Sequence, residues 1–258
     1  AGRLAFAQPT ARRLTAMEPT RRLYLETPAL ECNAAVQGIR GAEFAIAQSP
    51  FYPGGGGQPA DLGTVRDNDG QTFAVTGVRQ AEGVVWHTAA APLPDQWLGR
   101  TVLVQVDGAR RAALSRYHTV LHVLNTLTLR DHGGWITGAQ IAPDYARIDF
   151  KLERLSAELC ADLAGKVNAV IAADHPVTAH TLDAETFARR DDLLRTLEVR
   201  PPVVEGRVRI VRIAGFDEQA CGGTHVARTG QIGAFAIERT ENKGRINKRL
   251  YVRLATSP

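Results

Sequence analysis

The chain has 258 residues, 44% of them hydrophobic, which allows one large domain or two modest ones and excludes a disordered chain. No apolar run approaches the roughly 20 residues that a membrane helix needs, so we expect no membrane partner. The formal net charge of +4 permits a polyanionic partner such as RNA without requiring one.

The cysteines and the N-terminus bear on the cellular compartment. Cys32, Cys160 and Cys221 are too widely spaced for a disulfide framework and fit a reducing compartment with free or metal-bound thiols. The N-terminus lacks the charged region, apolar stretch and cleavage site of a secretion signal, so we expect a cytoplasmic protein. We interpret residues 1–21 as an N-terminal extension, because residues 1–16 precede the only methionine, Met17, and have no clear period.

Residues 22–107 are predicted to form mostly short strands. The stretch GTVRDNDGQTFAVTGV is typical of a hairpin, with Asp69 and Gly70 in its turn. The other predicted strands are LYLETPAL, ECNAAVQGI, AEFAIAQS, VVWHTA and TVLVQV. Short strands at regular spacing indicate a small barrel or sandwich, and we predict a β-barrel domain.

Residues 108–258 mix helices and strands. Residues 109–131 lack glycine and proline, carry apolar residues at helical spacing, and are followed by His132-Gly133-Gly134, which predicts a helix that stops there. A second helix is expected from Ser156 to Ala173 and a shorter one over 183–190. Strands are expected at RVRIVRI, GAFAIERTE and INKRLYVRL. The predicted fold class is therefore α+β, with a small N-terminal β-barrel domain followed by an α+β domain.

Two short motifs together predict a zinc site. His118 and His122 are four residues apart on the first long helix, so both imidazoles lie on one face. Cys221 and His225 are also four apart, in QACGGTH, where two glycines let the chain bend inward. Each motif alone is weak evidence. Both together, in a chain with seven histidines and three cysteines, favour a tetrahedral site with all four as ligands.

The residues between the two histidines leave two interpretations of the metal open. A zinc protease helix has the pattern HExxH, with glutamate as the general base, whereas this chain has Thr119, Val120 and Leu121. The zinc is then either structural with four protein ligands, or it serves a hydrolytic pocket with one position open to water or substrate.

A glycine-rich segment, SPFYPGGGGQPADLG at residues 49–63, is the second feature of interest. Its successive glycines expose backbone N–H groups and allow a ligand to approach closely, although no P-loop Gly-Lys-Ser/Thr follows. A turn between barrel strands is the alternative interpretation. We select Gly55, Gly56, Gly57 and Gln58 as candidate substrate contacts.

Four stretches in order resemble the AlaX family of alanyl-tRNA editing proteins, which is related to the editing domain of alanyl-tRNA synthetase. They are FYPGGGGQPADLG, HTVLH, QACGGTHVARTGQIGAFAI and ENKGRINKRLYVRL, and they span about residues 22–254. The resemblance implies that residues 108–258 are a zinc-binding editing domain with one Zn²⁺ held by His118, His122, Cys221 and His225. It also implies ATP-independent trans-editing by hydrolysis of the ester of tRNA(Ala) mischarged with serine or glycine, and no DNA partner.

The expected chemistry needs an activated water and stabilisation of an oxyanion. We assign no catalytic side chain and expect the zinc-associated water to act. Thr137, in GWITGAQI, is the candidate hydrogen-bond partner of the serine hydroxyl, although the family alignment there is ambiguous with Ile136. Among the arginines and lysines around the site, Arg116, Lys243 and Arg249 are predicted RNA contacts.

Three other functions remain open at this stage. Threonyl-tRNA synthetases carry a related domain with similar ligands, so seryl-tRNA(Thr) is an alternative substrate, although the glycine-rich block favours alanine. The second alternative is a tRNA-binding module with a structural zinc and no catalysis. The third is a zinc hydrolase with a small-molecule substrate, although the missing HExxH glutamate weighs against a protease.

Overall fold

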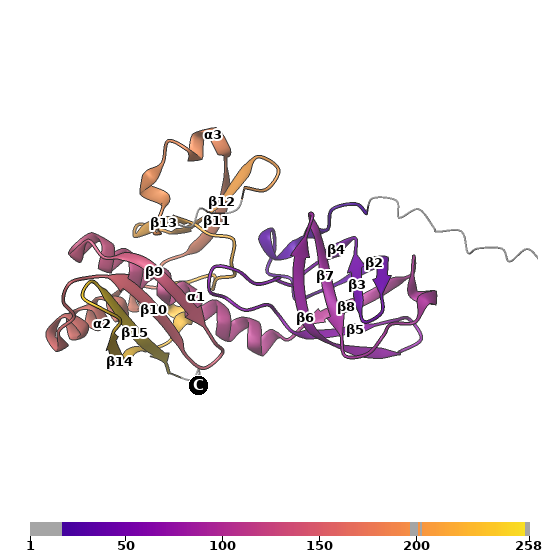
Figure 1. Ribbon diagram of the computed structural model, residues 1–258, viewed down its shortest axis with the longest axis horizontal. Helices are drawn as coiled ribbons and strands as arrows, with labels where there is room; N and C mark the ends of the chain where they lie inside the picture. The colour runs from indigo at the N-terminus through magenta and orange to yellow at the C-terminus, as the bar shows by residue number, and fades with distance from the viewer. Residues whose placement is uncertain (1–16, 197–200, 202, 256–258) are drawn as a thin grey trace, which may run out of the picture.

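The computed structural model describes residues 17–196, 201 and 203–255, which form a β-barrel and a mixed α/β part (Figure 1). Most of the predicted N-terminal extension, residues 1–16, lies outside the described residues. The segment from Met17 already packs on the barrel, because its side chain lies against Trp86 and Thr20 Oγ1 donates to Ile46 O at 3.2 Å. None of the helices formed by the described residues is long and apolar enough to span a membrane.

Six antiparallel strands close into a barrel in the order β2-β3-β7-β6-β5-β8, which confirms the predicted N-terminal β-barrel. Their inward residues are apolar at every second position, as Val102, Val104 and Val106 are on β8. The strands are β2 (Glu31–Arg40), β3 (Glu43–Ile46), β5 (Gly63–Arg66), β6 (Thr72–Ala81), β7 (Val84–Ala89) and β8 (Thr101–Val106). The core is filled by large side chains such as Phe44, Phe51 and Trp97.

Two local predictions in this part have different outcomes. The hairpin is confirmed: Arg66 pairs with Thr72, and Asp67 Oδ1 accepts from the backbone N–H groups of Asp69 and Gln71 to shape the turn. The prediction of a strand at residues 23–30 is wrong, because Leu23–Leu25 form the 3₁₀ turn η1. The remaining short elements are β1 (Arg21–Arg22), β4 (Gln48–Ser49) and η2 (Asp95–Trp97).

Helix α1 (Gly108–His132) leaves the barrel and forms the axis of the second part (Figure 1). Asp107 caps its start by accepting from Arg110 N, and Gly133 ends it in the left-handed conformation at φ 65°. The helix is buried along most of residues 114–128. Both the barrel loops and the C-terminal strands therefore pack against one continuous helix.

A four-stranded antiparallel sheet, in the order β14-β15-β10-β9, covers α1. Its inner face carries Ile148, Phe150, Leu250 and Val252, which are fully buried in one core with α1 and α2. The strands are β9 (Trp135–Ile141), β10 (Ala146–Lys151), β14 (Phe235–Asn242) and β15 (Asn247–Leu254). The predicted second helix is α2 (Ala157–Ala172), with Ser156 as its N-cap. The 3₁₀ turn η4 (Thr229–Ile232) precedes β14.

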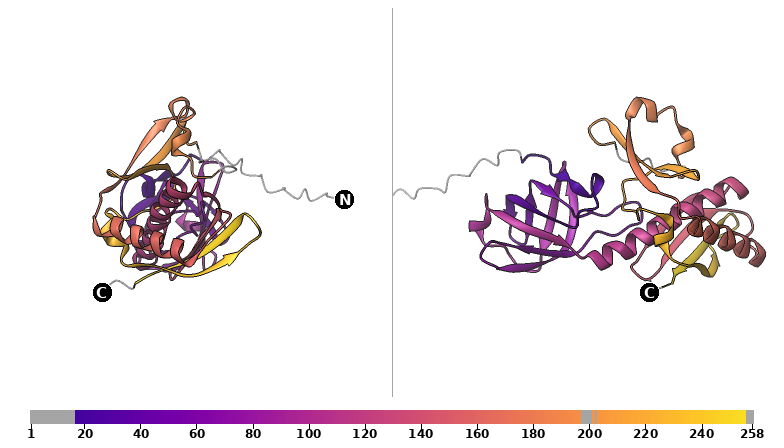
Figure 2. Two further views of the ribbon diagram at one scale, coloured as in Figure 1. Left: turned by 90° about the vertical axis from the view of Figure 1, so that its left-hand side faces the viewer. Right: turned by 180° about the vertical axis from the view of Figure 1, so that it is seen from behind.

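A smaller three-stranded sheet, β11-β12-β13, stands beside α1 and has its own small apolar cluster (Figures 1 and 2). Its strands are β11 (Val177–Asp183), β12 (Arg207–Ile213) and β13 (Asp217–Ala220). The helix expected over 183–190 is shorter: α3 covers Ala184–Phe187, and the turn η3 follows at Asp191–Leu193. The predicted α+β fold class is confirmed. This sheet positions the site because β13 leads directly into Cys221.

Candidate metal centre

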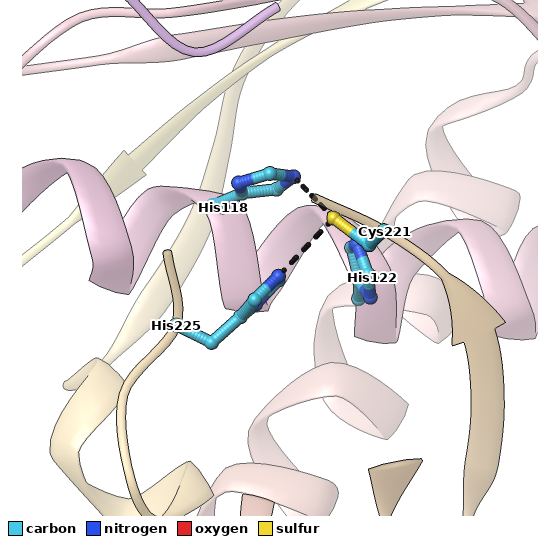
Figure 3. A group of neighbouring side chains, drawn as sticks. All are labelled: His118, His122, Cys221 and His225. Carbon is cyan, nitrogen blue, oxygen red and sulfur yellow. Dashed lines mark hydrogen bonds between the residues drawn. The ribbon is translucent and has the colours of Figure 1, made fainter. Parts of the chain in front are cut away.

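The four predicted ligands meet at one point. His118 and His122 project from successive turns of α1, while Cys221 and His225 come from the loop after β13 (Figure 3). Their ligand atoms all lie within 4.8 Å of one another. The histidines on α1 are buried, whereas Cys221 and His225 are partly exposed. A metal held here would therefore be reached from the side of the loop.

The distances fit a tetrahedral zinc ion. Cys221 Sγ lies 3.5 Å from His118 Nε2 and 3.4 Å from His225 Nε2. Zinc–nitrogen bonds of about 2.0 Å and zinc–sulfur bonds of about 2.3 Å, at a tetrahedral angle, separate sulfur and nitrogen by roughly 3.5 Å. These contacts, dashed in Figure 3, therefore have the spacing of ligands that share one ion. The group can hold a metal ion, and its donor types suit zinc.

Gln58 fixes the tautomer of His118. Its Oε1 accepts from the backbone N–H of Thr224 at 3.1 Å, which determines the orientation of the amide. The same oxygen lies 2.8 Å from His118 Nδ1, so Nδ1 must carry the proton. His118 Nε2 is then the unprotonated nitrogen and faces the metal position, as a ligand should.

Thr119 fixes the tautomer of His225. Its hydroxyl donates its single proton to Ser115 O at 2.8 Å. Toward His225 Nδ1, at 3.1 Å, the oxygen can then only accept, and it also accepts from Val226 N. His225 therefore carries its proton on Nδ1 and directs its free Nε2 toward Cys221. Two of the three imidazoles are thus oriented by neighbours before any ion binds.

Burial keeps the imidazoles neutral. It lowers the pKa of His118 to about 3, with a smaller effect from the Arg209 charge. It also lowers the pKa values of His122 and His225 well below the usual value. The pKa of Cys221 is raised by burial and held down by the Gly223 N–H and the Arg209 guanidinium. Neutral imidazoles are the form that binds metals, so the histidines are already in their ligand state at neutral pH.

Two polar side chains that sequence analysis missed hold the cysteine loop in place. Arg209 Nη1 donates to Cys221 O and to Gly223 O, both at 2.9 Å. Gln219 Nε2 donates to His122 O at 3.1 Å, and its Oε1 accepts from Asn125 Nδ2 at 3.0 Å, which anchors β13 to α1. No local pattern marks either residue, because their partners are distant in sequence.

The glycine-rich loop reaches from the barrel to this centre. Gly55, Gly56 and Gly57 all have positive φ, of 134°, 57° and 84°, which favours glycine at each position. Gly57 O accepts from Ile141 N at 2.8 Å, so the loop rests on β9. Gln58 is only 2% exposed, and its amide is directed at protein partners.

The structure places Thr137 and the predicted RNA contacts as follows. Thr137 is exposed on β9, and its hydroxyl donates to Asn247 Oδ1 at 2.8 Å. Arg116 donates to the carbonyl oxygens of Ile232 and Ala255 at 2.7 and 2.5 Å. The other two pair with acids: Lys243 with Glu241 at 2.8 Å, and Arg249 with Asp149 at 2.7 and 2.8 Å. All four therefore have internal partners.

The fold and the site define a class: a six-stranded barrel joined to an α/β part whose His/Cys group can hold a metal ion. Residues 208–251 match the family described as threonyl and alanyl tRNA synthetase second additional domain. Residues 19–110 match the family described as tRNA synthetases class II (A). The two matches fall on the two parts of the structure.

Comparison with individual proteins identifies the family. The chain is 32% identical over 237 residues to the alanyl-tRNA editing protein AlaX-M of Methanosarcina acetivorans, covering 90% of this chain and 97% of the relative. It is 34% identical over 240 residues to AlaX-M of Methanosarcina mazei, covering 90% and 94%. A match to the alanine–tRNA ligase of Pyrococcus abyssi, 37% identical, covers 86% of this chain and 24% of the ligase. The chain belongs to the AlaX family of alanyl-tRNA editing proteins, and the predicted resemblance is confirmed.

Proposed function

We propose that this protein removes serine or glycine from mischarged tRNA(Ala) by hydrolysing the aminoacyl ester, without ATP. The observation that carries the proposal is the cluster of one thiol and three imidazoles with zinc-like spacing, in a chain whose relatives are named alanyl-tRNA editing proteins. Those names support tRNA(Ala) as the partner. The choice of amino acid and the use of zinc are part of the proposal.

The metal centre would supply the chemistry of ester cleavage. His118, His122, Cys221 and His225 would hold one Zn²⁺ per chain, which when bound offers Lewis acidity to a water molecule or an ester carbonyl. In the described part of the chain, no Asp or Glu is hydrogen-bonded to these four ligands. We assign no catalytic side chain; a water molecule activated by the bound ion would supply the nucleophile.

The glycine-rich loop and β9 are the proposed amino-acid and adenosine contacts. The loop meets β9 and α1 at the proposed contacts, which are the backbone N–H groups of Gly56 and Gly57 and the neighbouring Gly55 and Gln58. A site that hydrogen-bonds the serine hydroxyl would leave its own polar group unpaired with alanine, which can give selectivity of about 10⁴. We propose Thr137 for that contact, in competition with its bond to Asn247.

Replacing Thr137 with valine tests this assignment. We expect Thr137→Val to slow serine release and to leave zinc content unchanged, because the residue is exposed and its hydroxyl donates to Asn247 rather than to a metal ligand. Rates on seryl- and glycyl-tRNA(Ala) should be compared, since glycine has no hydroxyl to lose. An unchanged rate of serine release would show that Thr137 does not contact the serine hydroxyl.

Contact with the tRNA backbone is proposed for Arg116, Lys243 and Arg249. Lys243 is the most exposed of the three, and its pair with Glu241 is a surface pair that a phosphate can replace. Affinity for tRNA should fall as salt rises, and each lost phosphate contact should reduce the salt slope by about one. A Lys243→Gln variant with an unchanged slope would exclude that residue.

One assay tests the whole proposal. tRNA(Ala) is charged with serine, glycine or alanine, and ester loss is followed with the zinc-loaded protein and after chelation. We expect serine release that depends on zinc, with alanyl-tRNA(Ala) spared. Serine release no faster than the uncatalysed rate would refute the proposal.

Two specific observations favour other functions, and the same assay separates them. The match over residues 208–251 is to a domain shared by threonyl and alanyl synthetases, which favours seryl-tRNA(Thr) as an alternative substrate. Four protein ligands also fit a closed, structural zinc site in a tRNA-binding module. Faster cleavage of seryl-tRNA(Thr) supports the first, and tRNA binding without cleavage supports the second.

A further inference from the structure

Three segments that are far apart in the sequence interlock around the ring of His118. They are the end of the glycine-rich loop at Gln58, helix α1, and the turn at Gly223. A Cβ atom at Gly223 would lie 2.1 Å from His118 Cε1 and 3.0 Å from Gln58 Oε1. Only a residue without a side chain lets the three segments approach this closely.

The amide of Gln58 bonds to both sides of this junction. Its Oε1 accepts from His118 Nδ1 at 2.8 Å and from Thr224 N at 3.1 Å, and its Nε2 donates to Thr224 Oγ1 at 2.8 Å. Thr224 Oγ1 lies in turn 2.8 Å from Ser115 Oγ on α1. One side chain from the barrel therefore holds a metal ligand of α1 and the residue beside the ligand His225.

The loop that carries Gln58 is itself held as a unit. Gly55 and Gln58 exchange two backbone hydrogen bonds of 3.0 Å, and the Tyr52 hydroxyl donates to Gly55 O at 2.8 Å. At Gly57 an added Cβ would fall 2.8 Å from Ala139 O of β9, so the loop is pressed against that strand. A displacement of Gln58 would therefore move the glycines with it.

We propose that Gln58 is a positioning residue that couples metal binding to the conformation of the glycine-rich loop. It orients His118 for the ion, and the bound ion would in turn fix the loop that we propose as a substrate contact. The coupling acts in both directions because a linkage free energy between two sites is reciprocal. This inference rests on the proposed zinc site, but not on the proposed deacylation.

Metal retention tests the first direction. Gln58→Met keeps the length of the side chain and removes its hydrogen bonds, whereas Gln58→Glu keeps an acceptor for His118 and Thr224. Loss of an outer-shell partner costs about 10–100-fold in metal affinity, so Gln58→Met should release zinc to a chromophoric chelator about 10–100-fold faster. Gln58→Glu should stay close to the wild-type rate. The control is Gln48→Met, since the side chain of Gln48 on β4 donates to Asn33 O of β2 and not to a metal ligand.

Hydrogen exchange tests the second direction in the same full-length proteins. In the wild type, zinc loading should slow exchange of the amides at 54–58, and in Gln58→Met the effect of zinc on those amides should vanish. Neither measurement uses aminoacyl-tRNA, so a failure of deacylation is seen separately. Wild-type amides that do not respond to zinc would overturn the coupling, even if Gln58→Met does not fold. A folded Gln58→Met with wild-type zinc release would overturn it as well.

Discussion

The buried ion pair between Arg111 and Asp61 offers a sharp test of how the glycine-rich loop is fixed to α1. The side chains are only 9% and 1% exposed, and Arg111 Nε lies 3.0 Å from both carboxylate oxygens. Arg111 Nη2 also donates to Pro50 O at 2.7 Å, and Asp61 accepts from Tyr52 N at 2.6 Å. Removing the arginine would leave a buried carboxylate with the Tyr52 N–H as its remaining partner.

Breaking such a pair from one side costs about 3–5 kcal/mol. With a urea dependence of about 1–3 kcal/mol per M, Arg111→Met should lower the unfolding midpoint by roughly 1–5 M. The double variant Arg111→Met/Asp61→Asn should lose less than Arg111→Met alone, because no unpaired charge stays buried. The control Arg189→Met removes an exposed pair with Glu185, worth about 0.3–0.5 kcal/mol. If Arg111→Met cost no more than this control, the pair would not fix the loop.

Three further predictions concern single sites. Gly223→Ala should lower zinc stoichiometry without unfolding the barrel, because the new methyl group meets the His118 ring; full zinc content by elemental analysis would contradict this. Arg209→Met should speed zinc release about tenfold, because the hydrogen bonds from Arg209 to two carbonyl oxygens of the cysteine loop are lost. The control Arg207→Met, on the same strand, should release zinc at the wild-type rate. Equal release rates for the two variants would show that Arg209 does not hold the cysteine loop. Burial lowers the pKa of His87 to about 4, against about 6.5 when unfolded, so its contribution to stability is lost as pH falls through this range. Wild type should therefore lose roughly 2 kcal/mol more than His87→Gln between pH 7.5 and 5 in urea titrations, and parallel losses would show that His87 does not titrate there.

Several features of this protein were determined by short-range patterns in the sequence. The periodic, glycine-free stretch that precedes Gly133 predicts α1, because helix formation depends on residues three and four apart. The same spacing places His118 and His122 on one face, and the chemistry of zinc selects Cys221 and His225 as the other ligands. The α+β class and the barrel also follow from local alternation and turns.

Only the tertiary structure decided how those ligands are oriented and supported. Gln58 and Thr224 are 166 residues apart, and Thr119 and His225 are 106 apart, so no local pattern relates them. A 3₁₀ turn at Leu23–Leu25 stands where a strand was expected over 23–30, and the helix expected over 183–190 covers only Ala184–Phe187. In such short segments, tertiary packing overrides weak local preferences.

The metal ligands could be predicted from the sequence and the residues that orient them could not, for a physical reason. A metal ligand is recognisable from its residue type, since few side chains bind zinc, whereas a residue that orients a ligand needs only one hydrogen-bonding atom in the right place. The sequence marks Gln58 as part of the glycine-rich segment but not as a neighbour of His118, and it becomes that neighbour only because the barrel loop, α1 and the turn at Gly223 fold against one another. The sequence thus determined which residues can bind the ion, and the fold decided which residues hold them ready to do so.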